Sequence, residues 1–333
     1  MSKDFQQRCR DLMVELGLIA IDDAISVTAL TGGVASDIAR IETDKGDFCV
    51  KFALPKLRVA ADWYAPVERN FAEFSYLKNL SEIAPESALT LYGHSASENG
   101  FAMAYLAGDN TYLWKPALFD GRGRGDEAKA VGSILGKVHH ASSQPDFDKS
   151  AFHNQDDFYA IRIEPYLVHT AKKHPMIATQ LHQMAEHLGS AERVLVHGDV
   201  SPKNIMFHDG QPFLLDAECA TMGDGCFDVA FCLNHLILKA VFVTASSSDY
   251  LSYCSDFWQS YQPFITWESQ ADFEKRLCQL LPMLMLARID GKSPVEYFNH
   301  VHHDFVRQLA LPLISEPPTD LSELLTRLRP IIA

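Results

Sequence analysis

The spacing of hydrophobic and polar positions divides the chain into a strand-rich first third and a helical remainder. Residues 3–18 have helical spacing, which predicts a first helix. Short alternating runs at 24–30, 36–42 and 48–54 predict three antiparallel strands, the last two joined by a tight hairpin turn. A helix is predicted over 66–80, with proline in its first turn, and two more short strands at 89–92 and 101–106.

After Gly108 the pattern becomes mainly helical. Helices are predicted at 131–141, 177–188, 227–243, 250–261, 273–286 and 295–309. The exception is the stretch 194–216, whose short apolar pieces predict strands. We therefore expect an α+β fold with an N-lobe over residues 1–105, built from an antiparallel sheet plus helix, and a larger, mainly helical C-lobe over residues 106–333.

Composition and charge narrow the function class. Of 333 residues, 47% are apolar and 22% charged, which is typical of a globular protein. The formal charge of −14 repels polyanions and argues against non-specific binding to nucleic acid. The first residues contain no apolar signal core, and no apolar run reaches the ~18 residues that a membrane helix requires. The seven cysteines are scattered without a CxxC pair, so we expect reduced thiols in a cytoplasmic protein without nucleic-acid or membrane partners.

The stretch His197–Asp216 carries the candidate chemistry. Phosphoryl transfer needs a carboxylate for the proton of the attacking hydroxyl, hard oxygen ligands for Mg²⁺ and a cation for the phosphates. Asp199 and Asn204 have the spacing of the base and the metal-binding asparagine in a kinase catalytic loop, and Asp216 ends a short hairpin further on. Glu218 stands two residues later, so in a strand it would face the same metal site as Asp216.

Lys51 is the candidate cation. It lies inside the apolar strand predicted at 48–54, where a lysine is unusual unless it is paired. Its partner should be a glutamate on the helix that follows. Glu73 or Glu68 would serve, and Glu73 is preferred because it stands at the edge of the buried helix face.

Two further signals have two interpretations each. Gly32 and Gly33 either form a nucleotide-binding loop or are only part of a hairpin turn, since the GxGxxG pattern is incomplete. Lys203, beside Asn204, either is solvated or contacts the γ-phosphate. A GxxxxGK[ST] motif is absent, which excludes a P-loop kinase.

The motif HGDVSPKNI at 197–205, followed by LLDAE at 214–218, resembles the aminoglycoside phosphotransferase and choline kinase superfamily. The resemblance implies a bilobal protein-kinase-like fold that binds ATP between its lobes and, with Mg²⁺, phosphorylates a hydroxyl of a small molecule. It implies that Asp199 is the catalytic base, that Asn204 and Asp216 hold the metal, and that Lys51 pairs with Glu73 beside the nucleotide phosphates.

The same resemblance assigns supporting and hinge positions. Residues 101–108 look like the interlobe hinge, with adenine bonded by backbone groups at Ala104 and Leu106. His197, in the HGD motif, and Asp228, at the start of a later helix, resemble the residues that support the catalytic loop.

A closer likeness joins segments 50–73, 216–238 and 286–297 to 5-methylthioribose kinases, which would make Arg288 a substrate contact. Those kinases are longer, and their catalytic loop lacks the asparagine that stands here at 204. We therefore expect a kinase of a sugar-like or amino-alcohol metabolite. One alternative is an antibiotic phosphotransferase for an aminoglycoside or a macrolide. A second is an inactive nucleotide-binding scaffold, which has no need of both a base and two metal ligands.

Overall fold

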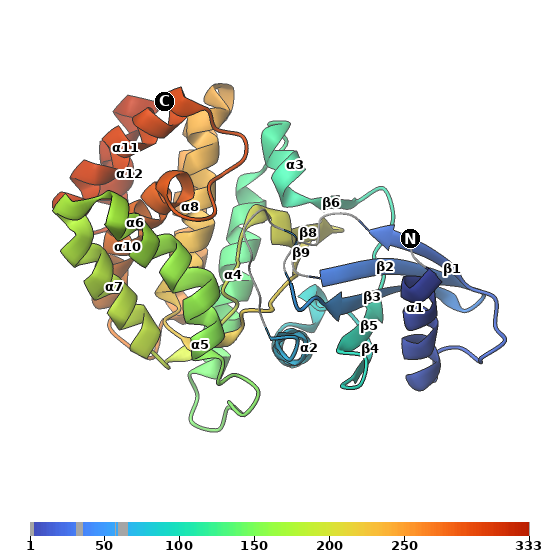
Figure 1. Ribbon diagram of the computed structural model, residues 1–333. Coiled ribbons are helices and arrows are strands. Elements are labelled where there is room, and N and C mark those ends of the chain that lie inside the picture. Colours follow the sequence, from blue (N-terminus) through green and yellow to red (C-terminus); the bar gives the residue numbers. More distant parts are fainter. Residues whose placement is uncertain (1–2, 31–35, 57, 59–65, 333) are drawn as a thin grey trace. The chain divides into compact units, whose positions relative to one another are not determined.

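The computed structural model describes residues 3–30, 36–56, 58 and 66–332, which form two compact units, Met1–Thr111 and Tyr112–Ala333 (Figure 1). The first unit contains a five-stranded antiparallel sheet in the order β1-β2-β3-β5-β4. Its strands are β1 (Ser26–Leu30), β2 (Ser36–Thr43), β3 (Gly46–Ala53), β4 (Leu91–Ser95) and β5 (Gly100–Ala104).

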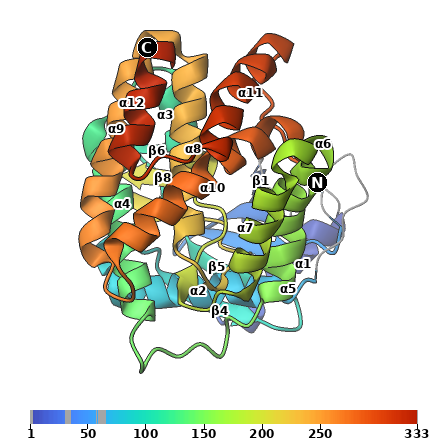
Figure 2. The same cartoon turned by 90° about the vertical axis from the view of Figure 1, so that its left-hand side faces the viewer.

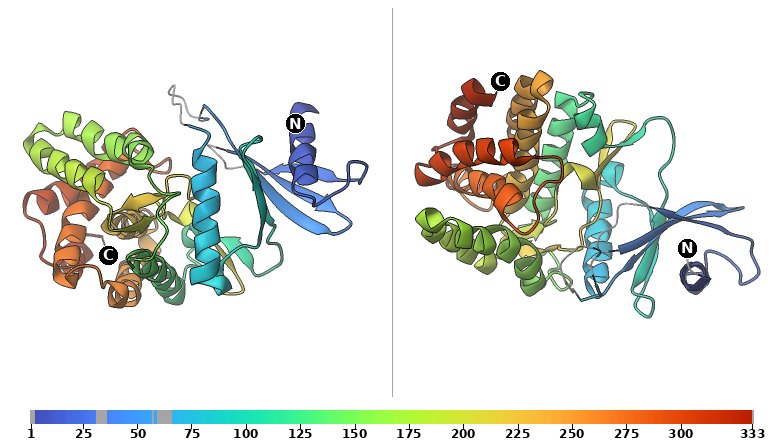
Figure 3. Two further views of the ribbon diagram at one scale, coloured as in Figure 1. Left: turned by 90° about the horizontal axis from the view of Figure 1, so that it is seen from below. Right: turned by 45° about the horizontal axis from the view of Figure 1, so that its top comes forward.

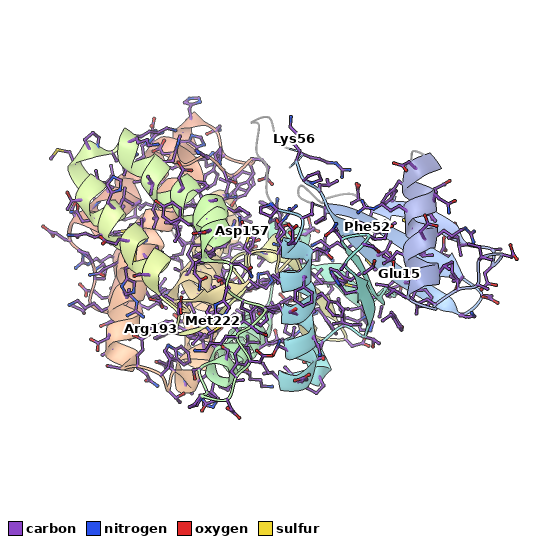
Figure 4. All side chains as sticks on the ribbon, turned by 60° about the horizontal axis from the view of Figure 1, so that its bottom comes forward. Glu15, Phe52, Lys56, Asp157, Arg193 and Met222 are labelled. Atoms are coloured by element: carbon purple, nitrogen blue, oxygen red, sulfur yellow. The ribbon has the colours of Figure 1, made fainter. Side chains whose placement is uncertain are left out.

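Two helices cover opposite faces of this sheet. Alternate residues of β3 point to opposite sides, so Phe48, Val50 and Phe52 form a buried core with helix α1 (Lys3–Glu15). Phe52, which Figure 4 labels, meets Phe5 edge-on, with ring centroids 6.1 Å apart. The other face of β3 carries Lys51, which pairs with Glu73 of helix α2 (Arg69–Ile83). Figure 3 shows α2 lying along the sheet. A short 3₁₀ turn, Pro85–Ser87, connects α2 to β4.

The second unit is mainly helical, and its long helices α4, α8, α9 and α10 pack together (Figure 2). Helix α8 is buried along almost its whole length and contacts both α9 and α10. The helices are α3 (Trp114–Phe119), α4 (Gly125–Ser142), α5 (Gln155–Phe158), α6 (His169–Lys173), α7 (Ala178–Ser190), α8 (Cys226–Phe242), α9 (Ser247–Tyr261), α10 (Gln270–Asp290), α11 (His300–Ser315) and α12 (Leu321–Ile332), with a π-helical segment η2 (Tyr159–Val168) between α5 and α6.

Short strands frame the loop that carries the candidate base. Strand β7 (Val194–Val196) pairs antiparallel with β10 (Thr221–Gly223), the strand of Met222 (Figure 4). A second small sheet has the order β6-β8-β9, with β6 (Thr111–Leu113), β8 (Ile205–His208) and β9 (Gln211–Leu214). The candidate catalytic loop is therefore the connection from β7 to β8.

The expected α+β fold, an antiparallel sheet with helices followed by a mainly helical part, is confirmed. The π-helical segment η2 and helix α12 were not predicted. All seven cysteines are free and buried. Among the described helices, none is by itself long and apolar enough to cross a membrane; α8 passes that test only together with Thr244–Phe264, from which it is bent by 117°.

Candidate active site

Asp228, in the first turn of α8, fixes the start of the loop after β7. Its Oδ2 accepts a hydrogen bond from the backbone N–H of His197 at 2.6 Å, and its Oδ1 accepts from the N–H of Gly198 at 2.8 Å. The carboxylate is fully buried, and Nε2 of His139 lies 3.4 Å from Oδ2. Two N–H groups without a strand partner are thus satisfied by one side chain, which holds the loop in a single position.

Gly198 and His197 shape the same turn. Gly198 has φ +78°, and a Cβ there would lie 2.9 Å from Cβ of Cys219, so only glycine fits. Burial lowers the pKa of His197, which favours the neutral imidazole, although the nearby carboxylates oppose this. Nδ1 of that ring accepts the backbone N–H of Asp199 at 3.2 Å, as only an unprotonated nitrogen can.

Asp199 is a buried carboxylate between two cations. Its Oδ2 lies 3.0 Å from Nη2 of Arg162 and 3.2 Å from Nζ of Lys203. Burial alone raises the pKa of Asp199, but Lys203 and Arg162 outweigh burial and hold the pKa of this carboxyl well below its usual range. In return Asp199 raises the pKa of Lys203. Asp199 is therefore ionised at any physiological pH.

Arg162 is the site residue that sequence reasoning missed. It lies buried on η2, and its Nε donates a hydrogen bond to the carbonyl of Gly198 while Nη2 contacts the Asp199 carboxylate. One planar guanidinium thus orients both the backbone and the side chain of the loop. The available signal was an arginine between two isoleucines in an apolar run, the same kind of signal that identified Lys51.

Asn204 ends a short 3₁₀ turn, Pro202–Asn204, and stays close to Asp199. Its Nδ2 donates to the Asp199 carbonyl at 3.2 Å, which orients the amide so that its oxygen is the group left to bind a metal. The backbone carbonyl of Asn204 accepts from the N–H of Leu215 at 2.8 Å. This bond connects the loop to the segment that carries Asp216.

Asp216 and Glu218 lie beyond the end of β9, so the strand geometry expected for them is wrong. Asp216 has φ +67°, a left-handed conformation that ends the extended chain, and alternation along a strand cannot place the two carboxylates on one side. Asp216 is half-buried and Glu218 is buried. Among the described residues, no three His, Cys, Asp or Glu side chains converge as a ready metal site. Metal binding by Asn204, Asp216 and Glu218 stays a prediction.

In the first unit, Lys51 and Glu73 form a buried ion pair. Nζ of Lys51 lies 2.7 Å from both carboxylate oxygens of Glu73, and each side chain is only 3% exposed. Glu68, the other candidate partner, is exposed just before α2. Gly32 and Gly33 lie outside the described residues.

The hinge positions follow β5. The N–H of Ala104 already donates to the carbonyl of Thr90 at 2.8 Å, so an adenine contact at Ala104 would have to use its carbonyl. Leu106 is half-buried beyond the strand. The nucleotide-binding role of Lys51, Glu73, Ala104 and Leu106 stays a prediction.

Arg288 lies near the end of α10. Its Nη1 donates to the Tyr166 hydroxyl at 3.1 Å and to the hydroxyl and carbonyl oxygens of Ser293. Tyr166 stands one turn after Arg162 on η2, and it acts on the pKa of Arg162 and of Lys203. Arg288 is thus connected, through Tyr166, to the surroundings of Asp199.

A model of the phosphotransferase enzyme family matches residues 26–264, which is more than half of the sequence. The chain belongs to the phosphotransferase enzyme family. The predicted membership of the aminoglycoside phosphotransferase and choline kinase superfamily is thereby confirmed, and family membership supports a small-molecule phosphotransferase. The likeness to 5-methylthioribose kinases stays a prediction.

Solved structures show the same fold as this phosphotransferase family member. A choline/ethanolamine kinase family protein from Mesorhizobium loti is 14% identical with a TM-score of 0.54, over 98% of this chain and 99% of that one. An amicoumacin kinase is also 14% identical with a TM-score of 0.54, over 97% and 100%. A choline kinase from Cryptosporidium parvum Iowa II is 12% identical with a TM-score of 0.51, over 99% and 96%. No curated protein sequence matches this chain.

Proposed function

We propose that the protein transfers the γ-phosphoryl group of ATP to a hydroxyl of a small metabolite, sugar-like or an amino alcohol, in a reaction that requires Mg²⁺. One observation carries the proposal: the Asp199 carboxylate is buried, kept ionised by Arg162 and Lys203, and bonded through its own carbonyl to Asn204. A structural aspartate has no need of this arrangement, whereas a phosphoryl-transfer site needs a base and a metal ligand fixed side by side.

In the proposed reaction, the hydroxyl oxygen of the acceptor attacks the γ-phosphorus and the bond from that phosphorus to the β–γ bridging oxygen breaks. ADP leaves, and the hydroxyl proton passes to the Asp199 carboxylate. Because the pKa of Asp199 is held low, the carboxylate is a weak base. It acts first by accepting a hydrogen bond from the hydroxyl and orienting it, and it takes the proton late, as the new P–O bond makes the hydroxyl acidic.

Asn204 and Asp216 would hold Mg²⁺, with Glu218 as a further candidate ligand. Amide and carboxylate oxygens are the hard donors that this ion prefers, and the bound ion would neutralise charge on the β- and γ-phosphates. Lys51, fixed by Glu73, would bind the phosphates of the nucleotide. The amicoumacin kinase of the same fold was solved with AMP-PNP and Ca²⁺, which supports a nucleotide and a divalent ion at this type of site.

The test is a screen for ADP release from ATP and Mg²⁺ with hydroxyl-bearing metabolites, together with kanamycin and erythromycin. The variant Asp199→Asn should bind ATP normally and lose about 10²–10⁴-fold in turnover. Asp209→Asn, a change of the same kind at an exposed turn position, is the matched control. Equal turnover in wild type and Asp199→Asn would refute the role of Asp199. Efficient phosphorylation of either antibiotic would replace the metabolic assignment, and no ADP release with any acceptor would favour an inactive scaffold.

A further inference from the structure

Helix α8 carries two basic residues on one of its buried faces. His235 and Lys239 are four residues apart, so their side chains leave the helix on the same side, and both are buried. Phe231, one turn earlier, stacks edge-on against His235 and also contacts Tyr166, with ring centroids 5.3 and 5.5 Å apart. This face of the most buried helix is therefore basic and adjoins the neighbourhood of Asp199.

Lys239 has no anionic partner. Its side chain is 1% exposed, and no described carboxylate forms an ion pair with its ammonium group. Nζ instead lies 5.3 Å from the ring centroid of Phe119 and 5.8 Å from that of Tyr297. The Tyr297 hydroxyl is itself buried without a hydrogen-bond partner among the described residues. A buried lysine is almost always paired, and an oxyanion would suit both the ammonium group and the tyrosine hydroxyl.

Arg288 is a second cation without a carboxylate. Its three hydrogen bonds go to neutral oxygens of Tyr166 and Ser293, and its buried Nε has no partner in the described part of the chain. Its guanidinium carbon lies 5.8 Å from the centroid of the Tyr166 ring. The guanidinium group thus has N–H groups free to donate hydrogen bonds to the oxygens of a carboxylate or phosphate.

The charges of the surrounding elements do not cancel these two cations. Lys115 of α3 pairs with Glu296, so that pair contributes no net charge. Burial, reinforced by Lys115 and Arg288, lowers the pKa of Lys239 to about 7, with Cys232 and Glu296 acting weakly in the other direction. Burial also lowers the pKa of His235 well below its usual value, so the imidazole is neutral. Positive charge therefore remains at Arg288, and Lys239 is partly protonated near pH 7, where a bound anion would favour its charged form.

This basic cluster is connected to the proposed base through Tyr166, which accepts a hydrogen bond from Arg288 and stands one turn after Arg162, the partner of Asp199. The charges of Arg288, Lys239, Asp199 and Lys203 all act on the pKa of His235. A molecule whose hydroxyl is held at Asp199 would therefore have Lys239 and Arg288 in its surroundings. A polycationic aminoglycoside or a choline-like ammonium group would be repelled there.

We propose that Lys239, Arg288 and the Tyr297 hydroxyl form a subsite for an oxyanion of the phosphate acceptor, so that the acceptor is an acidic hydroxyl compound bearing a carboxylate or a phosphate group. This inference rests on the proposed kinase function. It narrows the sugar-like and amino-alcohol acceptors named there to compounds that carry a carboxylate or a phosphate group. A bound oxyanion would form ion pairs with both Lys239 and Arg288 and would accept a hydrogen bond from the Tyr297 hydroxyl.

The subsite is tested by thermal unfolding with ADP and Mg²⁺ present to fill the nucleotide site. Inorganic phosphate, acetate and chloride are compared at pH 7 and equal ionic strength, and the variants are Lys239→Met and, as a control, Lys275→Met at an exposed position of α10. Relative to chloride, phosphate or acetate should raise the Tm of wild type and of Lys275→Met. This increase should be at least 2 °C larger than the increase for Lys239→Met. The more effective anion identifies the acidic group. Without either anion, Lys239→Met should unfold no earlier than wild type, because it removes an uncompensated buried charge.

Equal anion-induced shifts in Tm for all variants, or no shift in any, would overturn the subsite. Arg288→Gln gives a second reading of the anion shift if Lys239→Met does not fold. If the kinase proposal is wrong and the subsite is right, the anions should still raise Tm in a way that depends on Lys239, but no acceptor should cause release of ADP from ATP. Conversely, turnover of a neutral or cationic acceptor with a KM that Lys239→Met leaves unchanged would refute the subsite and keep the kinase.

Discussion

Replacing Asp228 with asparagine tests how the catalytic loop is held. Asp228 offers two carboxylate oxygens to two buried N–H groups, those of His197 at 2.6 Å and Gly198 at 2.8 Å. Asparagine has nearly the same shape but only one acceptor oxygen. One of the two N–H groups must then face an NH₂ group, in a place that water does not reach.

The cost can be worked from these two bonds. Losing one hydrogen bond to a charged group costs about 1.5–3 kcal/mol, and leaving a buried donor unsatisfied costs about 1–3 kcal/mol. The two terms overlap, so we expect a loss of about 3 kcal/mol in the free energy of unfolding for Asp228→Asn. For a unit of this size each kcal/mol lowers Tm by about 2–4 °C, which gives roughly 6–12 °C.

The assay is thermal unfolding of wild type, Asp228→Asn and the control Asp249→Asn, which changes an exposed aspartate in the first turn of α9. The control should lie within about 0.5 kcal/mol of wild type, as exposed substitutions generally do. A Tm for Asp228→Asn within 2 °C of the control would show that the two hydrogen bonds do not anchor the loop. Turnover of the variant should fall as well, because the loop positions Asp199.

Three other predictions address the site. Asp199 acts as a carboxylate, which is present above its pKa and lost as pH falls through it. Arg162→Gln should raise the pKa of Asp199 and move the acid limb of kcat/KM to higher pH, whereas Arg162→Lys should largely restore the wild-type profile. Superimposable pH profiles of wild type and Arg162→Gln would contradict the role of the ion pair. Lys51→Met should cost about 3–5 kcal/mol in the free energy of unfolding by denaturant because it removes the cation that lies 2.7 Å from the buried Glu73 carboxylate, and adding Glu73→Leu should recover most of the loss. A double variant no more stable than Lys51→Met would count against a paired charge. Asp216→Ala should abolish the Mg²⁺ dependence of ATP affinity in calorimetric titration; an unchanged dependence would remove Asp216 from the metal site.

Local patterns predicted the first unit well because its neighbouring strands are mostly joined by short connections. The strand expected at 36–42 is β2 at Ser36–Thr43, and the turn after it joins β2 to β3 as expected. Lys51 was recognisable because a charge inside an apolar strand requires a partner, and α2 follows closely enough to supply Glu73. The motif with Asp199 and Asn204 was recognisable for a similar reason, since a single loop holds both residues.

What the sequence left out depends on distant contacts and on local backbone geometry. Arg162 precedes Asp199 by more than thirty residues and lies on a π-helical segment, and helical periodicity does not indicate which remote carboxylate an arginine meets. Glu218 was assigned to the metal site on the assumption that the strand continues through Asp216. Asp216 instead adopts a positive φ, which the identity of an aspartate does not predict. The missing counter-charge of Lys239 is visible only when α3, α8 and α10 are packed together.

The buried cysteines make the folded protein resistant to thiol reagents. Burial raises the pKa of Cys9, Cys49 and Cys219 to about 12, and the thiolate is the form that reacts. Alkylation at neutral pH therefore has to wait for the chain to open around each thiol. Cys9 and Cys49 belong to the first unit and the other five to the second, so mass spectrometry of pulse-alkylated peptides would time the opening of each unit in the unmodified protein, with no engineered label.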